Sequence, residues 1–179
     1  MIPIEINRAW SMPNENTFSI PPIKRLIEKH IEGYSKVIDP FSRNNPFKNK
    51  CITNDINITF DADYHLDALD FLRIVGKADV ILFDPPYSPR QVSECYKMAS
   101  VAVNMQTTQA SFWSNIKKQI SDNILRGGKA ITCGWNSGGI GKKYGFEIIE
   151  ILLVAHGGWH NDTIVTVERR TGAVQKKLF

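Results

Sequence analysis

The sequence is poor in cysteine, has no long apolar run and shows no strong excess of one charge. Its three cysteines, Cys51, Cys95 and Cys133, are scattered and form no Cys-x-x-Cys pair, which argues against a disulfide framework and indicates a reducing compartment. The longest apolar stretch, 148–155, is interrupted by Glu150 and is too short to span a bilayer. The N-terminus has no apolar signal region. We therefore expect a cytoplasmic protein without a membrane partner.

The charge balance leaves a nucleic-acid partner open without requiring one. The 179 residues carry a formal net charge of +4, a mildly basic value. There is no internal repeat, low-complexity run or inter-domain linker, and the length suits one domain. We expect a single domain over 1–179, with an N-terminal segment and helix at 1–34 and a flexible basic tail at 171–179.

Strand and helix patterns alternate along most of the chain. Residues 1–19 are interpreted as polar and irregular. The pattern predicts seven strands, at 35–39, 51–55, 62–66, 78–83, 129–134, 146–155 and 163–170. It predicts helices from the cap at Ser19 to Gly33 and at 67–75, 89–100 and 109–125. The fold class is α/β, with a mostly parallel seven-stranded sheet, a C-terminal antiparallel hairpin and helices on both faces.

The strand at 78–83 ends in the most informative stretch of the sequence, Asp84-Pro85-Pro86-Tyr87. Two prolines cannot continue a sheet ladder, so the chain leaves the sheet in a rigid turn. Asp84 and Tyr87 are therefore expected at the carboxyl end of a strand, the edge where open α/β sheets bind ligands. A turn that merely ends the strand is the alternative.

This turn suits chemistry on the exocyclic amine of a nucleobase, which is a poor nucleophile because its lone pair is delocalised into the ring. The Asp84 carboxylate and the Pro85 carbonyl could accept hydrogen bonds from the two amine protons and direct the lone pair at a methyl donor. Tyr87 offers an aromatic face for an extruded base, worth about 1–3 kcal/mol.

The Asp84–Tyr87 tetrapeptide resembles the catalytic motif of the DPPY-type, amino-group class I S-adenosylmethionine-dependent methyltransferases, which act on adenine N6 or cytosine N4. The resemblance implies a Rossmann-like domain, S-adenosylmethionine as cofactor and catalytic roles for Asp84, Pro85, Pro86 and Tyr87. No gap in the pattern is long enough for a target-recognition domain, so the chain resembles a small stand-alone member of phage or prophage type.

Upstream, Asp39-Pro40-Phe41 resembles the start of the Asp-Pro-Phe-x-Gly-x-Gly loop that holds the methionine part of the cofactor in this family. Arg43 and Asn45 stand where that loop has glycine. Asparagine tolerates a positive φ better than most residues. Arg43 either pairs with the cofactor carboxylate or weakens cofactor binding.

The resemblance implies further cofactor contacts by five residues. Asp55 would hydrogen-bond the ribose hydroxyls, Asp67 and Ala68 would meet the adenine, and Phe18, together with Trp10, would keep water from the methionine end. Three of these residues have a structural alternative: a solvated acid at a strand end for Asp55, a helix cap for Asp67, and a staple at the start of a helix for Phe18.

Five residues are candidates for contact with the target base or its phosphates: Arg90, Trp135, Trp159, His160 and Asn161. For Trp135 the pattern slightly favours a buried core tryptophan over a wall of the base pocket. For Arg90 a solvated surface residue is the default interpretation. The two histidines of the loop around Trp159 have no evident third ligand, so no metal is expected.

The leading prediction is methyl transfer from S-adenosylmethionine to adenine N6 in DNA, with the base flipped out of the helix. RNA adenine, cytosine N4 and a protein glutamine amide present the same planar amine. Glutamine enzymes of this type usually carry asparagine at the position of Asp84, which favours nucleic acid. A non-enzymatic module that binds nucleic acid or protein also fits the altered glycine loop. A separate specificity protein is a further expected partner, while the target sequence and oligomeric state stay open.

Overall fold

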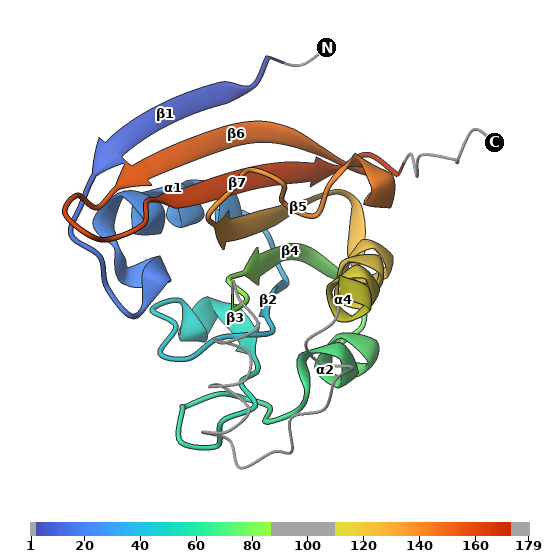
Figure 1. Ribbon diagram of the computed structural model, residues 1–179. Coiled ribbons are helices and arrows are strands. Elements are labelled where there is room, and N and C mark those ends of the chain that lie inside the picture. The colour runs from blue at the N-terminus through green and yellow to red at the C-terminus, as the bar shows by residue number, and fades with distance from the viewer. Residues whose placement is uncertain (1–2, 87–109, 173–179) are drawn as a thin grey trace.

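The structure is a computed structural model that describes residues 3–86 and 110–172 as one seven-stranded sheet with helices on both faces (Figure 1). The strand order is β1-β6-β7-β5-β4-β2-β3. The strands are β1 Glu5–Trp10, β2 Val37–Asp39, β3 Cys51–Thr53, β4 Ala78–Phe83, β5 Ile124–Gly134, β6 Phe146–Ala155 and β7 Thr163–Arg170. The helices are α1 Pro21–Ile31, α2 Ala68–Ile74 and α4 Ala110–Asn123, with short 3-10 turns at Thr17–Ser19, Lys48–Lys50 and Lys142–Tyr144. The predicted α/β fold class is confirmed.

Most neighbouring strands run parallel, and β7 is the exception. It pairs antiparallel with both β5 and β6, whereas β1–β6, β4–β5, β2–β4 and β2–β3 are parallel pairs. The bounds predicted for β6 and β7 and their hairpin are confirmed, because the short connection at 156–162 allows no crossover. All strands except β7 therefore end at the same edge of the sheet.

The predicted strand at 62–66 is wrong. That stretch pairs with the sheet only through one isolated bridge between Asn54 and Tyr64. The Asp63 carboxylate accepts hydrogen bonds from the Thr53 amide at 2.8 Å and the Thr53 hydroxyl at 2.9 Å. This side chain satisfies a donor that a full ladder would otherwise pair, so no regular strand forms.

The expectation of an irregular N-terminus is also wrong, because Glu5–Trp10 forms the edge strand β1 beside β6. Apolar and polar residues alternate at Ile4, Glu5, Ile6 and Asn7, which is a strand signal that Arg8 interrupts. The sheet thus has seven strands as predicted, but β1 takes the place of the expected strand at 62–66.

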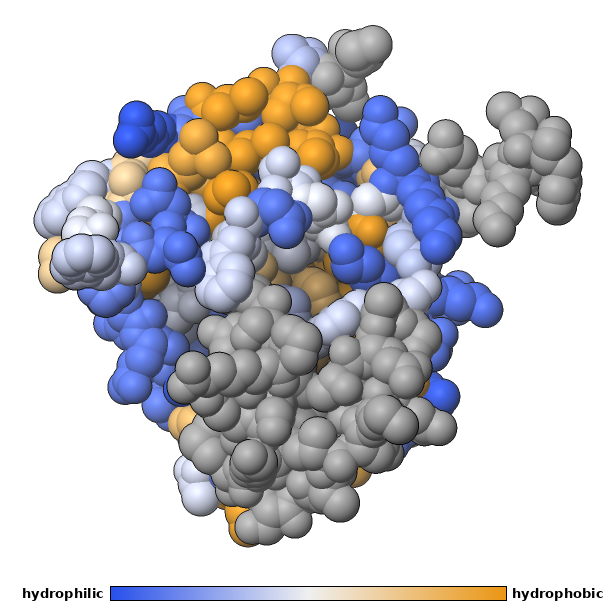
Figure 2. Space-filling model, viewed as in Figure 1, coloured by the Kyte–Doolittle hydropathy of each residue, from blue (hydrophilic) through white to orange (hydrophobic). Residues whose placement is uncertain are grey.

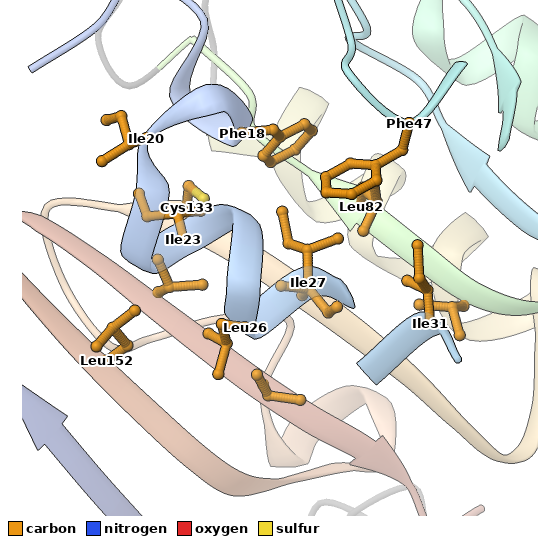
Figure 3. Packing of buried hydrophobic residues seen from close by; sticks show 14 of the residues in the cluster. Phe18, Ile20, Ile23, Leu26, Ile27, Ile31, Phe47, Leu82, Cys133 and Leu152 are labelled. Carbon is orange, nitrogen blue, oxygen red and sulfur yellow. The ribbon is translucent and has the colours of Figure 1, made fainter. Parts of the chain in front are cut away.

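Helix α1 covers one face of the sheet, over β5, β6 and β7. Pro21 and Pro22 occupy its first turn, and Ile20 is its N-cap with no side-chain hydrogen bond, so the predicted cap at Ser19 is wrong. Its apolar side chains point into the sheet (Figure 3). This cluster joins Phe18, Ile20, Ile23, Leu26, Ile27 and Ile31 to Leu82, Cys133 and Leu152.

Helices α2 and α4 cover the other face, over β2 and β4. Phe71 and Leu72 of α2 and Ile116 and Ile120 of α4 are fully buried there. The predicted helix at 89–100 lies outside the described residues. Within 3–86 and 110–172, no helix is long and apolar enough to cross a membrane.

Candidate active site

Three carboxylates follow three neighbouring strands at their common carboxyl edge. Asp39 is the last residue of β2, Asp84 comes directly after β4, and Asp55 follows the end of β3 by two residues. In the order β4-β2-β3 these strands are adjacent and lie about 4.8 Å apart. The fold therefore brings together the acids that the sequence placed on the target side and on the cofactor side.

Asp39 is a buried acid without a cation. It has no exposed surface, and within the described part of the chain no lysine or arginine side chain forms an ion pair with it. Burial, together with the nearby charges of Asp84 and Asp55, raises the pKa of Asp39 to about 8 against the opposing hydrogen bonds from the Phe41 amide and Asn45. A cationic ligand at this position would stabilise the ionised carboxylate.

Arg43 adopts the backbone conformation that glycine has in such loops. Its φ of 42° is the only positive φ of a non-glycine residue among those described, a conformation that costs about 1–2 kcal/mol. Its amide donates to Asp55 Oδ2 at 2.9 Å, and its guanidinium lies 5.7 Å from the centre of the Phe60 ring. Of the two positions where the family loop has glycine, Arg43 thus keeps a positive φ, and its guanidinium lies near the Phe60 ring.

Asn45 covers the carboxylate of Asp39. Its Nδ2 donates to Asp39 Oδ2 at 2.7 Å, and its Oδ1 accepts from the Phe47 amide at 2.6 Å. Beside it, the Ser42 hydroxyl is buried and has no hydrogen-bond partner in the described structure. In this loop the Asp39 carboxylate thus accepts a hydrogen bond from the Asn45 side chain. The Ser42 hydroxyl could form a hydrogen bond with a ligand.

Two of the segments predicted to contact the cofactor, around Phe18 and at 41–45, line a small cavity together with Asp84. Residues 15–18, 41–46 and Asp84 enclose about 10 Å³ between them, which is room for about one water molecule. Phe18 is 4% exposed and belongs to the α1 cluster, so it serves both as a cavity wall and as the start of that core.

Trp10 does not share this position. It lies on β1, at the far end of the strand order from β2 and β3, and is 66% exposed. The expectation that it covers the cofactor end is wrong, because β1 joins the opposite side of the sheet.

The remaining cofactor candidates have structural partners of their own. Asp55 accepts from the amides of Arg43 and Asn57, and Asp67 caps α2 by accepting from the Leu69 amide at 2.9 Å. Ala68 is buried in the core under α2. Carboxylate oxygens can accept more than one hydrogen bond, so the ribose and adenine contacts stay predictions.

On the target side, Pro85 and Pro86 are half-buried directly after Asp84. Trp135 follows β5, the neighbour of β4, and is 47% exposed, so it is no core residue.

Trp159, His160 and Asn161 are exposed in the β6–β7 loop, at the same edge but two to three strand positions from β4. Tyr87 and Arg90 lie outside the described residues. The described ranges contain no group of three or more His, Cys, Asp or Glu residues that could hold a metal ion.

Sequence reasoning missed Asn54, which organises this edge. Its side chain is 1% exposed, and its Nδ2 donates to the carbonyls of Pro40 at 3.2 Å and Leu66 at 3.0 Å. Its Oδ1 accepts from the Leu66 amide at 2.9 Å. One side chain therefore joins the segments after β2, after β3 and before α2. An asparagine directly after a short strand was the available signal.

Replacing Asn54 with alanine should destabilise the protein by about 2–4 kcal/mol, because it leaves buried backbone groups of Pro40 and Leu66 without partners. Chemical denaturation followed by circular dichroism measures the change. Asn57→Ala is the control, since the Asn57 side chain forms hydrogen bonds only to the neighbouring, exposed Thr59. Equal effects of the two substitutions would contradict this role of Asn54.

No protein-family model and no curated protein sequence matches this chain, but solved structures share its fold. N-methyltransferase NodS from Bradyrhizobium japonicum WM9 gives a TM-score of 0.59 at 9% identity, over 89% of this chain and 99% of NodS. A second NodS structure is in complex with S-adenosyl-L-homocysteine. TrmN from Thermus thermophilus gives a TM-score of 0.56 at 14% identity, over 84% of this chain and 49% of TrmN.

NSun6 from Pyrococcus horikoshii, in a structure with SFG, gives a TM-score of 0.53 at 12% identity, over 81% of this chain and 49% of NSun6. The chain thus spans about half the length of TrmN and of NSun6. At these identities the likenesses show the fold alone. The chain has the Rossmann-like α/β fold of methyltransferase structures, as the sequence predicted.

Proposed function

We propose that this chain transfers a methyl group from S-adenosylmethionine to the exocyclic N6 amine of adenine in DNA. The observation that carries the proposal is the convergence of Asp39, Asp55 and Asp84 on one sheet edge, with Asp84-Pro85-Pro86 leaving the sheet there. The N-methyltransferase fold neighbour supports methyl transfer in general, and the Asp84 turn supports an amine on a nucleobase as the acceptor.

The cofactor half of the site fits a cationic ligand. Asp39 lacks a counter-charge in the described structure, and the Ser42 hydroxyl lacks a partner there. We assign Asp39 and Ser42 to the methionine end of the cofactor and Asp55 to the ribose. S-adenosylmethionine supplies an electrophilic methyl group on a positively charged sulfur.

The target half orients the amine. In this proposal the Asp84 carboxylate and the Pro85 carbonyl each accept a hydrogen bond from one of the two amine protons. The nitrogen lone pair then faces the methyl carbon. As the nitrogen–carbon bond forms, the sulfur–carbon bond breaks and the amine acquires positive charge. The anionic Asp84 stabilises that charge, and the surplus proton then leaves to solvent.

Asn45→Gly should raise the affinity for S-adenosylmethionine by about fivefold, because the cofactor no longer competes with one hydrogen bond from a neutral donor, worth about 1 kcal/mol, for the carboxylate of Asp39. The same substitution should lower the unfolding temperature of the ligand-free protein. Calorimetric titration and thermal unfolding measure the two effects. Asn44→Gly is the matched control, because Asn44 is exposed beside it; a weaker affinity in Asn45→Gly than in Asn44→Gly would contradict the competition.

Trp135→Ala should weaken binding of DNA by about tenfold or more, since stacking on one base contributes about 1–3 kcal/mol. Trp159→Ala should have a smaller effect, because the loop of Trp159 lies two to three strand positions from β4, whereas Trp135 follows the strand next to it. Fluorescence anisotropy with a labelled duplex compares the two variants. A larger loss in Trp159→Ala would place the base pocket nearer to β6.

Adenine in RNA and the N4 amine of cytosine present a similar exocyclic amine to the Asp84 turn, so these bases are the alternative methyl acceptors. A non-enzymatic module is the second candidate, and one observation favours it: Asn45 satisfies Asp39 and the enclosed cavity holds about one water molecule. Titration with S-adenosylmethionine separates module from enzyme. Transfer of a labelled methyl group to DNA, followed by digestion to nucleosides, tests the proposed reaction itself.

A further inference from the structure

Strand β1 has an open side. It pairs with β6 on one side only, and no other strand within the described ranges lies beyond it, as its place at the rim of the sheet shows (Figure 1). A six-residue edge strand with free backbone groups is a template for pairing with another strand.

The backbone groups that face outward can be identified. The Ser11 amide donates to the Ala155 carbonyl at 3.1 Å, so residue 11 faces β6. Because alternate residues of a parallel strand direct their amide and carbonyl to opposite sides, the odd residues of β1 face β6. The even residues, Ile6, Arg8 and Trp10, direct theirs to the open side.

The side chains around this edge are unusually apolar for a surface. Ile4, Ile6 and Trp10 are 47%, 64% and 66% exposed. On the face of the sheet opposite α1, Ile6 is in register with Ile151 of β6. Figure 2 shows an apolar patch over the part of the surface where Figure 1 shows β1 and β6. None of the described helices covers it, since α2 and α4 pack over β2 and β4.

We propose that β1 pairs antiparallel with β1 of a second copy of this chain, about a two-fold axis beside Asn7. In this register Ile4 lies opposite Trp10 of the second copy and Ile6 lies opposite its Arg8. Outward-facing residues then meet outward-facing residues, so the pair exchanges complete hydrogen-bond rings. The apolar patches around β1 of the two copies then form one continuous surface across the dimer interface.

The sequence of β1 selects this register over its neighbours. Outward-facing residues must meet, so the axis can shift only by a whole residue along the strand. A shift to Arg8 sets two like charges opposite each other, which is destabilising, and a shift to Ile6 sets Arg8, Ala9 and Trp10 opposite residues that precede β1. A strand that is complementary to itself makes an isologous, closed contact, which a dimer requires.

The arrangement is independent of the reaction proposed above. Strand β1 runs parallel to β4 and β2 through the shared sheet. An antiparallel β1 pair therefore turns the two carboxyl edges, and with them the two candidate sites, to opposite sides of the joined sheet.

Light scattering during size-exclusion chromatography of the full chain tests the proposal. The expected mass is about twice the 20.3 kDa of one chain. Arg8→Pro removes an outward amide and should give a folded monomer, since proline is tolerated at an open edge. Ala9→Pro removes an amide that faces β6 and should lower the unfolding temperature instead. Ile58→Lys, at an isoleucine that is 78% exposed outside β1, should leave the mass unchanged.

A cross-link tests the register. In a Cys95→Ser background, Asn7→Cys should form a disulfide between two chains on mild oxidation, because residue 7 meets itself at the axis within disulfide range. Ala9→Cys should not, since its opposite residue is Glu5 of the second copy. Cys51 and Cys133 are buried, which limits competing reactions. A monomeric wild-type protein, a dimeric Arg8→Pro variant, or a stronger cross-link at residue 9 than at residue 7 would overturn the proposal.

Discussion

Replacing Asp84 with alanine is expected to lower the rate of methyl transfer by about 10²–10³-fold, the usual loss when one pre-positioned polar group is removed from a transition state. Asp84 directly follows β4 and borders the small cavity, and its charge acts on Asp39. Its carboxylate is the group that both orients the target amine and stabilises the charge that the amine gains. Single-turnover kinetics with labelled S-adenosylmethionine measure the loss.

Cofactor affinity should survive this substitution. Asp84 raises the pKa of Asp39 by charge repulsion, so its removal makes an ionised Asp39 easier to form. Asp122→Ala is the matched control, because Asp122 is exposed near the end of α4, at the opposite edge of the sheet. A loss of cofactor binding in Asp84→Ala that equals its loss of rate would contradict a role limited to the target.

Replacing Asp39 with asparagine is expected to weaken S-adenosylmethionine binding by about 10–100-fold, because a hydrogen bond between a cation and a carboxylate contributes about 1.5–3 kcal/mol. The asparagine keeps the size of the side chain but loses its charge. Calorimetric titration measures the affinity. Asp63→Asn is the control: this acid lies at the same edge but bonds to Thr53, so its replacement should alter stability more than affinity.

The pKa of Asp39 adds a pH dependence to both stability and binding. Burial raises it from 3.8 to about 8, so between these values the folded chain keeps a proton that the unfolded chain has lost. The contribution of Asp39 to stability is therefore largest below pH 4 and is lost as the pH rises towards 8. Cofactor affinity should rise over the same range and level off above it, since the cation binds the ionised form. Asp39→Asn should lose both trends, and unchanged trends would contradict the assignment.

The sequence predicted the sheet better than it predicted the edges of the sheet. The central and C-terminal strands carry continuous or alternating apolar residues, and for Phe146–Ala155 and Thr163–Arg170 even the bounds agree. Around residues 62–66 a similar pattern failed, because the Asp63 side chain bonds to Thr53 in place of a ladder. At β1, Arg8 obscured the alternation that Ile4 and Ile6 began.

For the site, the positions of the acids could be predicted and the state of the loop could not. Asp39 and Asp84 each end a buried strand, and parallel strands share an edge, so their proximity follows from the pattern. The bond from Asn45 to Asp39 depends on a turn that only the folded chain defines. The same holds for Arg43, whose positive φ is stabilised by the hydrogen bond from its backbone amide to the Asp55 carboxylate.

One measurement tests the proposed reaction most directly. The full chain is incubated with labelled S-adenosylmethionine and, separately, with duplex DNA, single-stranded DNA and RNA, and each product is digested to nucleosides. The proposal predicts labelled N6-methyladenine from DNA, absent with Asp84→Ala and present with Asp122→Ala. Cofactor binding without transfer to any of the three nucleic acids would contradict it.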